Sequence, residues 1–261
     1  IAKPYYPADY LADASPHRVL KTVYIETEWD PTDPIGELRW IHSVAEEHGY
    51  PNAVVAQAWL DREDVAEVLA EAAQFPLMRS VRHKPAAAKS AAEAVRGGPG
   101  SMDDAKWRDG YALLAKHGLR FDLQTPWWHL AAAVELAKDF PTVPLILNHT
   151  GLPSDRSESG LSGWRAAMAT LAEVDNVRVK ISGIGIPGEA WTAASQSYVV
   201  RETIAMFGVD RCMFASNFPV DGLCGSYSTI FEGFSQIVSD LTQAERNALF
   251  VENALRVYAI D

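Results

Sequence analysis

The stretch Cys212-Met213-Phe214-Ala215-Ser216-Asn217-Phe218-Pro219-Val220-Asp221 is the part of the sequence from which the fold can be argued. It begins as a short apolar run, of the kind that forms a buried strand, and then changes to the polar pair Ser216-Asn217. Proline follows, and an acid lies four residues beyond Asn217. Buried parallel strands that end in polar side chains are typical of α/β barrels. The stretch therefore predicts one strand of such a barrel.

Earlier apolar runs have the same character, and each ends in a different polar residue. Between them, apolar residues recur at helical spacing, as in Ile35, Leu38 and Ile41. Strand and helix thus alternate along the chain, which indicates a parallel sheet. The expected strands span residues 19–26, 53–58, 77–81, 119–123, 145–147, 177–181 and 212–215.

These strands predict a (β/α)8 TIM barrel in which the first strand is absent from the chain as given. Such a barrel needs eight strands and seven are recognisable, so we expect the eighth to precede Lys3, where residues 3–15 suggest an irregular lead-in. No linker or change of composition divides the chain, which favours a single domain over residues 1–261. The alternative is an open, doubly wound sheet of seven strands, although no Gly-x-Gly-x-x-Gly motif supports a dinucleotide-binding version.

Composition narrows the classes of partner. The formal net charge is -11 and no run is rich in Lys or Arg, which argues against nucleic acid or an anionic membrane. Cys212 and Cys224 lie close together, so a disulfide framework is not expected and a cytoplasmic location is favoured. No apolar run has membrane-spanning length, and no signal peptide is visible. We expect a small-molecule substrate, and a homo-oligomer stays open.

The polar residues at the expected strand ends should converge at one mouth. They supply cations, imidazoles, carboxylates and amides, a set that suits binding a polar or anionic molecule and moving a proton. The set comprises Glu26, Gln57, Arg82, His83, Asp122, Gln124, Asn148, His149, Lys180, Asn217 and Asp221.

His149 is the strongest single candidate because it directly follows an apolar strand and precedes a turn. It could polarise a carbonyl, orient water or ligate a metal; the alternative is a histidine that is hydrogen-bonded near a strand end. Arg82 could hold a carboxylate in bidentate fashion or anchor a loop. Asp122 could be a base or a structural acceptor. Lys180 is expected inside the barrel, where a lysine needs a partner.

Two further features concern the rim and the metal. Residues 86–101 form a long stretch of small residues, which we interpret as a lid. Trp128 suits either packing or sugar stacking. No His-x-His or His-Glu-x-x-His motif is present, whereas a catalytic zinc normally has three protein ligands, so no metal ligand is assigned.

With these residues identified, the chain resembles the amidohydrolase superfamily, in particular the amidohydrolase-2 group that includes lactonases acting on sugar lactones and on pyrone dicarboxylate. The matching segments occur in the family's order and cover most of the chain from Val23 onward. Together they are specific for the group but not for a substrate. They are Val81-Arg82-His83-Lys84-Pro85, Phe121-Asp122-Leu123-Gln124, Leu147-Asn148-His149-Thr150-Gly151, Val179-Lys180-Ile181-Ser182-Gly183 and Phe214-Ala215-Ser216-Asn217-Phe218-Pro219.

The resemblance implies roles for some residues and one departure. The family's first strand carries a His-x-His pair, which this chain lacks, and a later-strand histidine falls on His149. The family's last-strand aspartate, which activates water, falls on Asn217, and a neutral amide cannot accept a proton. Asp221 lies close enough in sequence to substitute, with Asp122 and Glu26 as further candidates. Zinc or manganese would be expected only if a strand before Lys3 supplied ligands.

These arguments predict a hydrolase that opens a lactone or related ester of a small polar or carboxylated molecule. Arg82 and Lys180 would hold a carboxylate or polarise the ring carbonyl, and His149 would assist at the carbonyl oxygen. Asn217 would donate a hydrogen bond, while Asp221 or Asp122 activates water. The alternatives are a metal-dependent decarboxylase of an unsaturated acid and a barrel that binds without catalysis. His83, Gln124, Glu26 and Trp128 complete the expected substrate-binding set.

Overall fold

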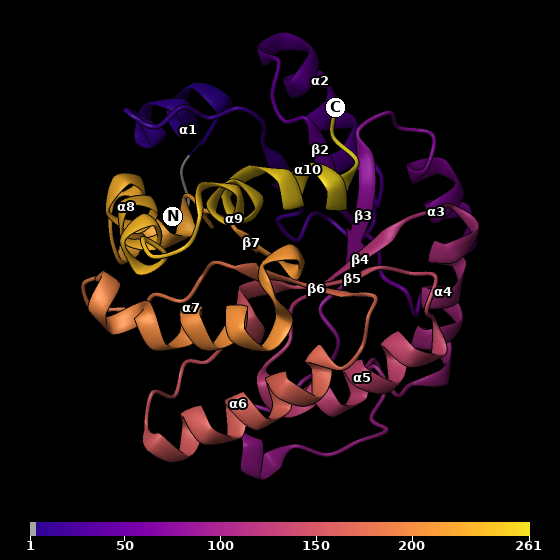
Figure 1. The fold of residues 1–261 in the computed structure, drawn as a ribbon. Coiled ribbons are helices and arrows are strands. Elements are labelled where there is room, and N and C mark those ends of the chain that lie inside the picture. The colour runs from indigo at the N-terminus through magenta and orange to yellow at the C-terminus, as the bar shows by residue number, and fades with distance from the viewer. Residues whose placement is uncertain (1–3) are drawn as a thin grey trace.

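The computed structural model describes residues 4–261, and its centre is one parallel sheet of seven strands. The strands pair in chain order, and the sheet curves into a half-barrel like that of a TIM barrel (Figure 1). The predicted fold is confirmed; the place expected for the eighth strand, before Lys3, lies outside the described residues. The strands are β1 (Val23–Ile25), β2 (Ala53–Gln57), β3 (Met78–Arg82), β4 (Arg120–Leu123), β5 (Leu145–Leu147), β6 (Val177–Ile181) and β7 (Cys212–Phe214).

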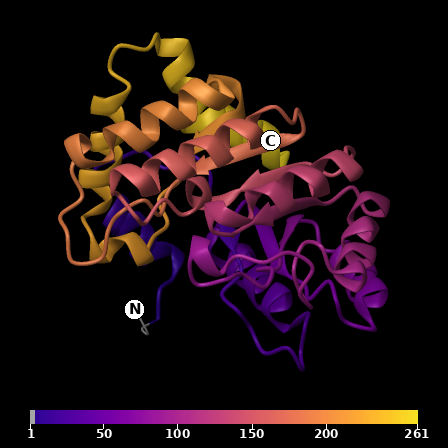
Figure 2. The same cartoon turned by 90° about the horizontal axis from the view of Figure 1, so that it is seen from below.

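Helices α2 to α8 follow the strands and cover the outer face of the curved sheet (Figures 1 and 2). Their apolar faces pack against every second strand residue, since strand side chains alternate between the two faces. The helices are α1 (Pro7–Ala14), α2 (Gly36–His48), α3 (Val65–Ala72), α4 (Ala105–Lys116), α5 (Leu130–Asp139), α6 (Glu158–Ala172), α7 (Ala193–Phe207), α8 (Tyr227–Ile237), α9 (Gln243–Asn247) and α10 (Asn253–Tyr258).

A second, smaller apolar cluster lies on the inner face of the sheet. Ile146 and Met213 belong to it, and so do Val257 and Tyr258 from the last helix, α10. The guanidinium of Arg120, at the start of β4, donates to the backbone oxygen of Val257. The end of α10 therefore lies at the N-terminal ends of the strands, which leaves their C-terminal ends for the mouth.

The irregular lead-in predicted for residues 3–15 is wrong over most of its length, because Pro7–Ala14 forms the helix α1. Proline is favoured in the first turn of a helix, and the Asp9 carboxylate accepts from the Tyr6 backbone N–H at 2.8 Å. The hydroxyl of Tyr10 lies 3.3 Å from those of Ser216 and Tyr227. Helix α1 therefore contacts both the turn after β7 and the start of α8.

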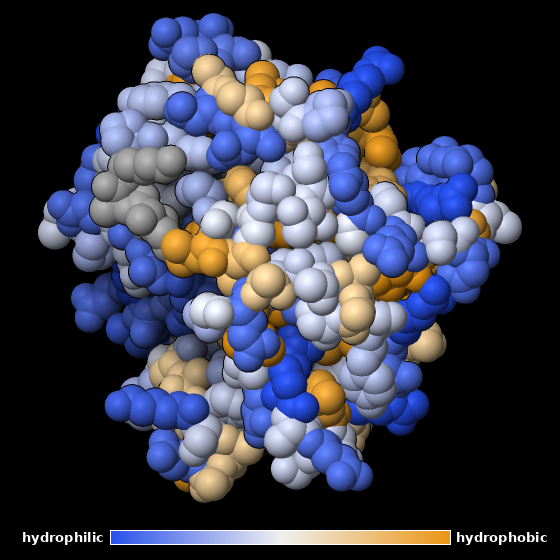
Figure 3. Space-filling view, turned by 90° about the vertical axis from the view of Figure 1, so that its left-hand side faces the viewer, coloured by the Kyte–Doolittle hydropathy of each residue, from blue (hydrophilic) through white to orange (hydrophobic). Residues whose placement is uncertain are grey.

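The face formed by α1, α7 and α8 shows hydrophobic residues scattered among hydrophilic ones (Figure 3). A cavity of about 470 Å³ lies beside the turn after β7, and its lining includes Asp13, Phe218 and Leu223. Within residues 4–261, no helix is both long enough and apolar enough to cross a membrane.

Candidate active site

The backbone of the turns after the strands marks one end of the sheet. Six non-glycine residues in the described chain have left-handed φ angles, and five of them follow β1, β5 or β7. A left-handed conformation costs a non-glycine residue roughly 1–2 kcal/mol, and such strain gathers at functional sites. The five residues are Glu28, His149, Thr150, Leu152 and Asn217.

The first group of residues at this end surrounds Asp221. We call it the Asp221 cluster, and it consists of Asp221, Asn217, Gly183, His149 and Ser182. The Asn217 amide donates to Asp221 Oδ1 at 2.6 Å, and the Gly183 backbone N–H donates to Oδ2 at 3.2 Å. Asp221 is 6% exposed. Burial raises the pKa of its carboxyl, while the two hydrogen bonds oppose that rise. Asp221 is therefore a buried carboxylate without a cationic hydrogen-bond partner in the described chain.

His149 lies against Gly183, the residue whose backbone N–H donates to Asp221. Its Nδ1 is 3.0 Å from the Ser182 hydroxyl, and a Cβ built on Gly183 would lie only 2.4 Å from the same nitrogen. Gly183 also has a φ of +58°, so both the ring position and the backbone require glycine. Burial, assisted by the charges of Lys180 and Arg82, lowers the pKa of His149 to about 3. The imidazole is therefore neutral across the physiological range.

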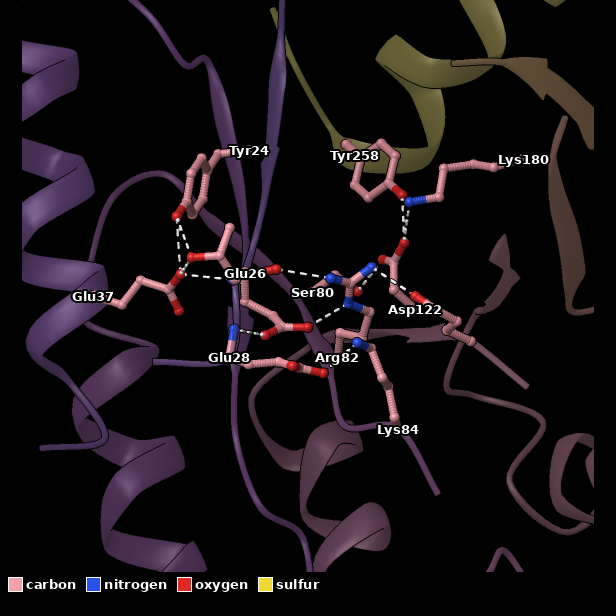
Figure 4. Close-up of polar contacts among 12 residues, drawn as sticks. Tyr24, Glu26, Glu28, Glu37, Ser80, Arg82, Lys84, Asp122, Lys180 and Tyr258 are labelled. Carbon is pink, nitrogen blue, oxygen red and sulfur yellow. Dashed lines mark hydrogen bonds and ion pairs between the residues drawn. The ribbon is translucent and has the colours of Figure 1, made fainter. Parts of the chain in front are cut away.

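Asp122 has a different environment, shown in Figure 4. Its Oδ1 accepts from Tyr258 at 2.9 Å and pairs with Lys180 Nζ at 2.6 Å, while Oδ2 accepts from Ser80 at 2.7 Å. Burial lowers the pKa of Lys180, although its pairing with Asp122 opposes this. Both oxygens of Asp122 are thus committed to protein partners. We call these four residues the Asp122 cluster.

Arg82 and Glu26 form an ion pair on the β1–β3 side of the mouth (Figure 4). Arg82 also donates to the Glu26 backbone oxygen at 2.7 Å and to Gln124 Oε1 at 3.1 Å. Lys84 pairs with Glu28 beside them. Arg82 and Lys180, the cations expected to hold a substrate carboxylate, are therefore each paired with a carboxylate of the chain.

Two predicted substrate contacts lie apart from this group. His83 Nδ1 accepts from the Leu60 backbone N–H at 3.0 Å, and its ring stacks on Trp107 in the core beneath the helices. Trp128 donates through Nε1 to the Ala88 oxygen at 3.1 Å, so it fastens the 86–101 loop. The geometry gives His83 and Trp128 packing and anchoring contacts, and a role at the substrate for either one stays a prediction.

The loop over residues 86–101 has several attachments to the body of the protein. Besides Trp128, His129 Nε2 accepts from the Ala88 N–H at 2.9 Å. Arg96 pairs with Asp103 and with Glu135 of α5. Movement of this loop as a lid stays a prediction.

Several residues at the mouth and beneath it were not singled out from the sequence as site residues. Ser182 and Gly183 were visible only as the end of a strand, although the Ser-Gly pair after an apolar run is a usable signal. Asn148 was noted at a strand end but given no role. Tyr258 gave no signal, because a helical tyrosine near the C-terminus is usually a packing residue.

The described donors do not fit a metal site of the usual catalytic kind. Within residues 4–261, no three His, Cys, Asp or Glu side chains are grouped to hold a metal ion. Glu26 is bound to Arg82, and both oxygens of Asp221 accept hydrogen bonds from the chain. A catalytic zinc normally has three protein ligands, and the described residues do not provide that set.

Comparison with known proteins gives consistent results. The amidohydrolase family model matches residues 1–260. The uncharacterized protein y4mH of Sinorhizobium fredii is 42% identical over 260 residues, which cover 100% of this chain and 87% of y4mH. An L-fucono-1,5-lactonase of Burkholderia multivorans is 30% identical over 173 residues, covering 61% of this chain and 57% of the lactonase. A zinc-bound amidohydrolase structure from Burkholderia multivorans superposes with a TM-score of 0.84 at 23% identity, covering 100% of this chain and 90% of that protein.

Proposed function

The chain belongs to the amidohydrolase family, and from this premise we propose that it hydrolyses the lactone ring of a small, hydroxylated, uncharged molecule. The observation that carries the proposal is the Asp221 cluster, in which a buried carboxylate and a neutral imidazole meet at Gly183. Similarity to an L-fucono-1,5-lactonase supports the same class of reaction.

In the proposed reaction Asp221 is the general base. A raised pKa makes a carboxylate a better proton acceptor at neutral pH, and general-base catalysis contributes about 10²–10⁴-fold. Asp221 takes a proton from water as the water oxygen bonds to the lactone carbonyl carbon. It returns this proton to the ring oxygen when the carbon–oxygen bond of the ring breaks. Asn217 and the Gly183 N–H hold the carboxylate in place.

His149 is proposed to stabilise the carbonyl oxygen. If the Ser182 hydroxyl donates to Nδ1, the neutral ring carries its proton on Nε2 and donates it to the substrate. A neutral imidazole can donate this hydrogen bond without first being charged in a buried site. Asn217 occupies the position at which the family would have a water-activating acid. In the proposed reaction Asp221 activates the water instead, and Asn217 holds the Asp221 carboxylate by a hydrogen bond.

The charges of the mouth favour an uncharged substrate. Arg82 and Lys84 are matched by Glu26 and Glu28, and Lys180 is matched by Asp122. Asp221, by contrast, has no cationic partner in the described chain, and its carboxylate is negative. A substrate dicarboxylate would therefore meet neutralised cations and one carboxylate. This consideration favours a sugar-type lactone over a carboxylated one.

A pH-indicator assay on two matched groups of lactones tests the proposal. The first group contains neutral hydroxylated δ- and γ-lactones, and the second contains lactones that carry one or two carboxylates. We expect acid release from the first group with at least ten-fold higher kcat/KM. Carbon dioxide release from an unsaturated acid would replace the proposal with decarboxylation. Binding without turnover across both groups would favour a non-catalytic barrel.

A further inference from the structure

Asn148 has a property that the proposed reaction does not use. It follows β5 and is fully buried, yet neither its amide nitrogen nor its amide oxygen has a hydrogen-bond partner within residues 4–261. Buried polar side chains are nearly always hydrogen-bonded, and each exception requires an explanation. Asn148 leaves both ends of one side chain unsatisfied, beside the residue proposed to act on the carbonyl.

Strand alternation places this side chain on the inner face of the sheet. Leu147 belongs to the outer core and Ile146 to the inner apolar cluster, so the next residue, Asn148, faces inward. Continuing the register of the paired strands by one residue puts Asn148 between Gln124, which follows β4, and Lys180 on β6. Asn148 therefore lies in the fully buried layer beneath the mouth.

The neighbouring polar groups are already engaged elsewhere. The carbonyl oxygen of Gln124 accepts from Arg82, and the ammonium of Lys180 pairs with Asp122. His149 lies next in the chain, and its Nδ1 lies against the Ser182 hydroxyl. These contacts leave the amide of Asn148 as an unmatched donor and acceptor.

We propose that Asn148 is a binding residue whose amide forms hydrogen bonds with a hydroxyl group beneath the mouth. A primary amide offers an N–H donor and a carbonyl acceptor side by side. A hydroxyl group can accept from the first and donate to the second, whereas a carboxylate has no donor and an ammonium has no acceptor. The hydroxyl is either one on the substrate or that of an ordered water beneath it. The inference rests on the proposed function for the identity of the substrate.

The chain offers a matched control in Asn253. This asparagine is also fully buried, but its amide nitrogen donates to the backbone oxygens of Val209 and Cys212, and its oxygen accepts from Arg256. Replacing a satisfied buried amide by leucine should lower the melting temperature, because its partners lose their hydrogen bonds. Replacing an unsatisfied one should not lower it. Asn148→Leu and Asn253→Leu therefore separate a binding role from a structural one.

The test combines melting temperatures with calorimetric binding of two non-hydrolysable probes, a trihydroxylated δ-lactam and δ-valerolactam. We expect Asn148→Leu to keep or raise the melting temperature, whereas Asn253→Leu lowers it by several degrees. If the hydroxyl belongs to the substrate, Asn148→Leu weakens binding of the hydroxylated lactam at least ten-fold and leaves δ-valerolactam unchanged, because a site built to bind a hydroxyl depends strongly on that contact. If it belongs to water, both lactams bind as before and kcat falls by a similar factor for every lactone.

Two results would overturn the inference. One is a fall in the melting temperature of Asn148→Leu that is as large as the fall in Asn253→Leu. The other is unchanged lactam binding with no change in turnover. Lactam binding does not require catalysis, so an inactive wild-type protein whose preference for the hydroxylated lactam is lost in Asn148→Leu would reject lactone hydrolysis and still support the role of Asn148.

Discussion

The interior of the half-barrel holds two buried aspartates whose surroundings differ in kind. Asp122 pairs with Lys180 and accepts hydrogen bonds from Ser80 and Tyr258. Within residues 4–261 the carboxylate of Asp221 accepts only from the uncharged donors Asn217 and Gly183, and burial raises its pKa. A cation and two hydroxyls hold the carboxylate of Asp122 in an ion pair, whereas the carboxylate of Asp221 has neutral donors and a raised pKa, which favours taking a proton. Their partners, more than their burial, therefore distinguish the paired acid Asp122 from Asp221, the acid proposed to be the general base.

The largest expected effect comes from the same substitution made at each aspartate. Asp221→Asn should lower kcat/KM on the preferred lactone by about 10²–10⁴-fold, because an amide cannot accept the proton from water. Asp122→Asn should keep turnover per folded molecule within about ten-fold, although fewer molecules remain folded. Steady-state kinetics corrected for the folded fraction measure both. The opposite pattern would exchange the roles assigned to the two clusters.

The next effect tests the ion pair of the Asp122 cluster. Asp122→Leu should lower the free energy of unfolding by about 3–5 kcal/mol, because Lys180 would remain buried without its counter-ion. The double variant Asp122→Leu/Lys180→Met should recover much of this loss, since apolar residues of similar size often replace a buried ion pair without penalty. Urea unfolding measures the three free energies. Losses that simply add would show that the two residues are not coupled.

Gly183→Ala tests whether His149 must lie where it does. The added Cβ would come 2.4 Å from His149 Nδ1, so the ring must move, and we expect kcat/KM to fall about 100-fold from the misplaced imidazole. Gly118→Ala is the control, because Gly118 also has a positive φ of +63° and nothing within 4 Å of its would-be Cβ. The control should lose about 1–2 kcal/mol of stability but keep its kcat/KM. Equal losses of kcat/KM in the two variants would contradict a requirement for His149 at this position.

The last expected effect is a pH dependence of stability. The pKa of His149 falls from its ordinary value of 6.5 to about 3 in the folded protein, so between these values the unfolded chain binds a proton that the folded chain does not. The stability contributed by the neutral ring is complete above pH 6.5 and is lost as the pH falls towards 3. Its slope is at most about 1.4 kcal/mol per pH unit. His149→Gln should flatten the stability curve of the wild type in this window, and an unchanged slope would contradict the neutral ring of the folded protein.

Much of the fold could be predicted from the sequence because its signals are local. Each expected strand overlaps an observed one, and apolar alternation correctly put Lys180 inside the sheet at 6% exposure. The helix Pro7–Ala14 was missed because proline and tyrosine were interpreted as a loop, although Pro7 occupies a position that favours helix initiation. Helix α7 begins at Ala193, because Thr192 caps it by accepting from the Ser195 N–H, another signal that depends on residues close in the chain.

The candidate site was predictable as a set of residues but not as an arrangement. Strand ends supplied His149, Asp221, Asn217, Arg82 and Glu26, because the C-terminal ends of parallel strands share one edge. The neutralisation of Arg82 by Glu26 could not be predicted, since the two lie 56 residues apart in the chain. The outward placement of His83 against Trp107 followed only from packing in the outer core.

The sequence by itself determined the alternation of strands and helices and the polar residues that end the strands, because both depend on neighbours a few residues away. It also contained the hydrogen bond between Asn217 and Asp221, which are four residues apart. Only the tertiary structure decided which aspartate is locked, because Tyr258 reaches Asp122 across 136 residues of chain. It alone showed that Asn148 is buried without a partner within residues 4–261. Hydrogen-bond satisfaction depends on every segment that packs around a group, and a one-dimensional pattern does not specify those segments.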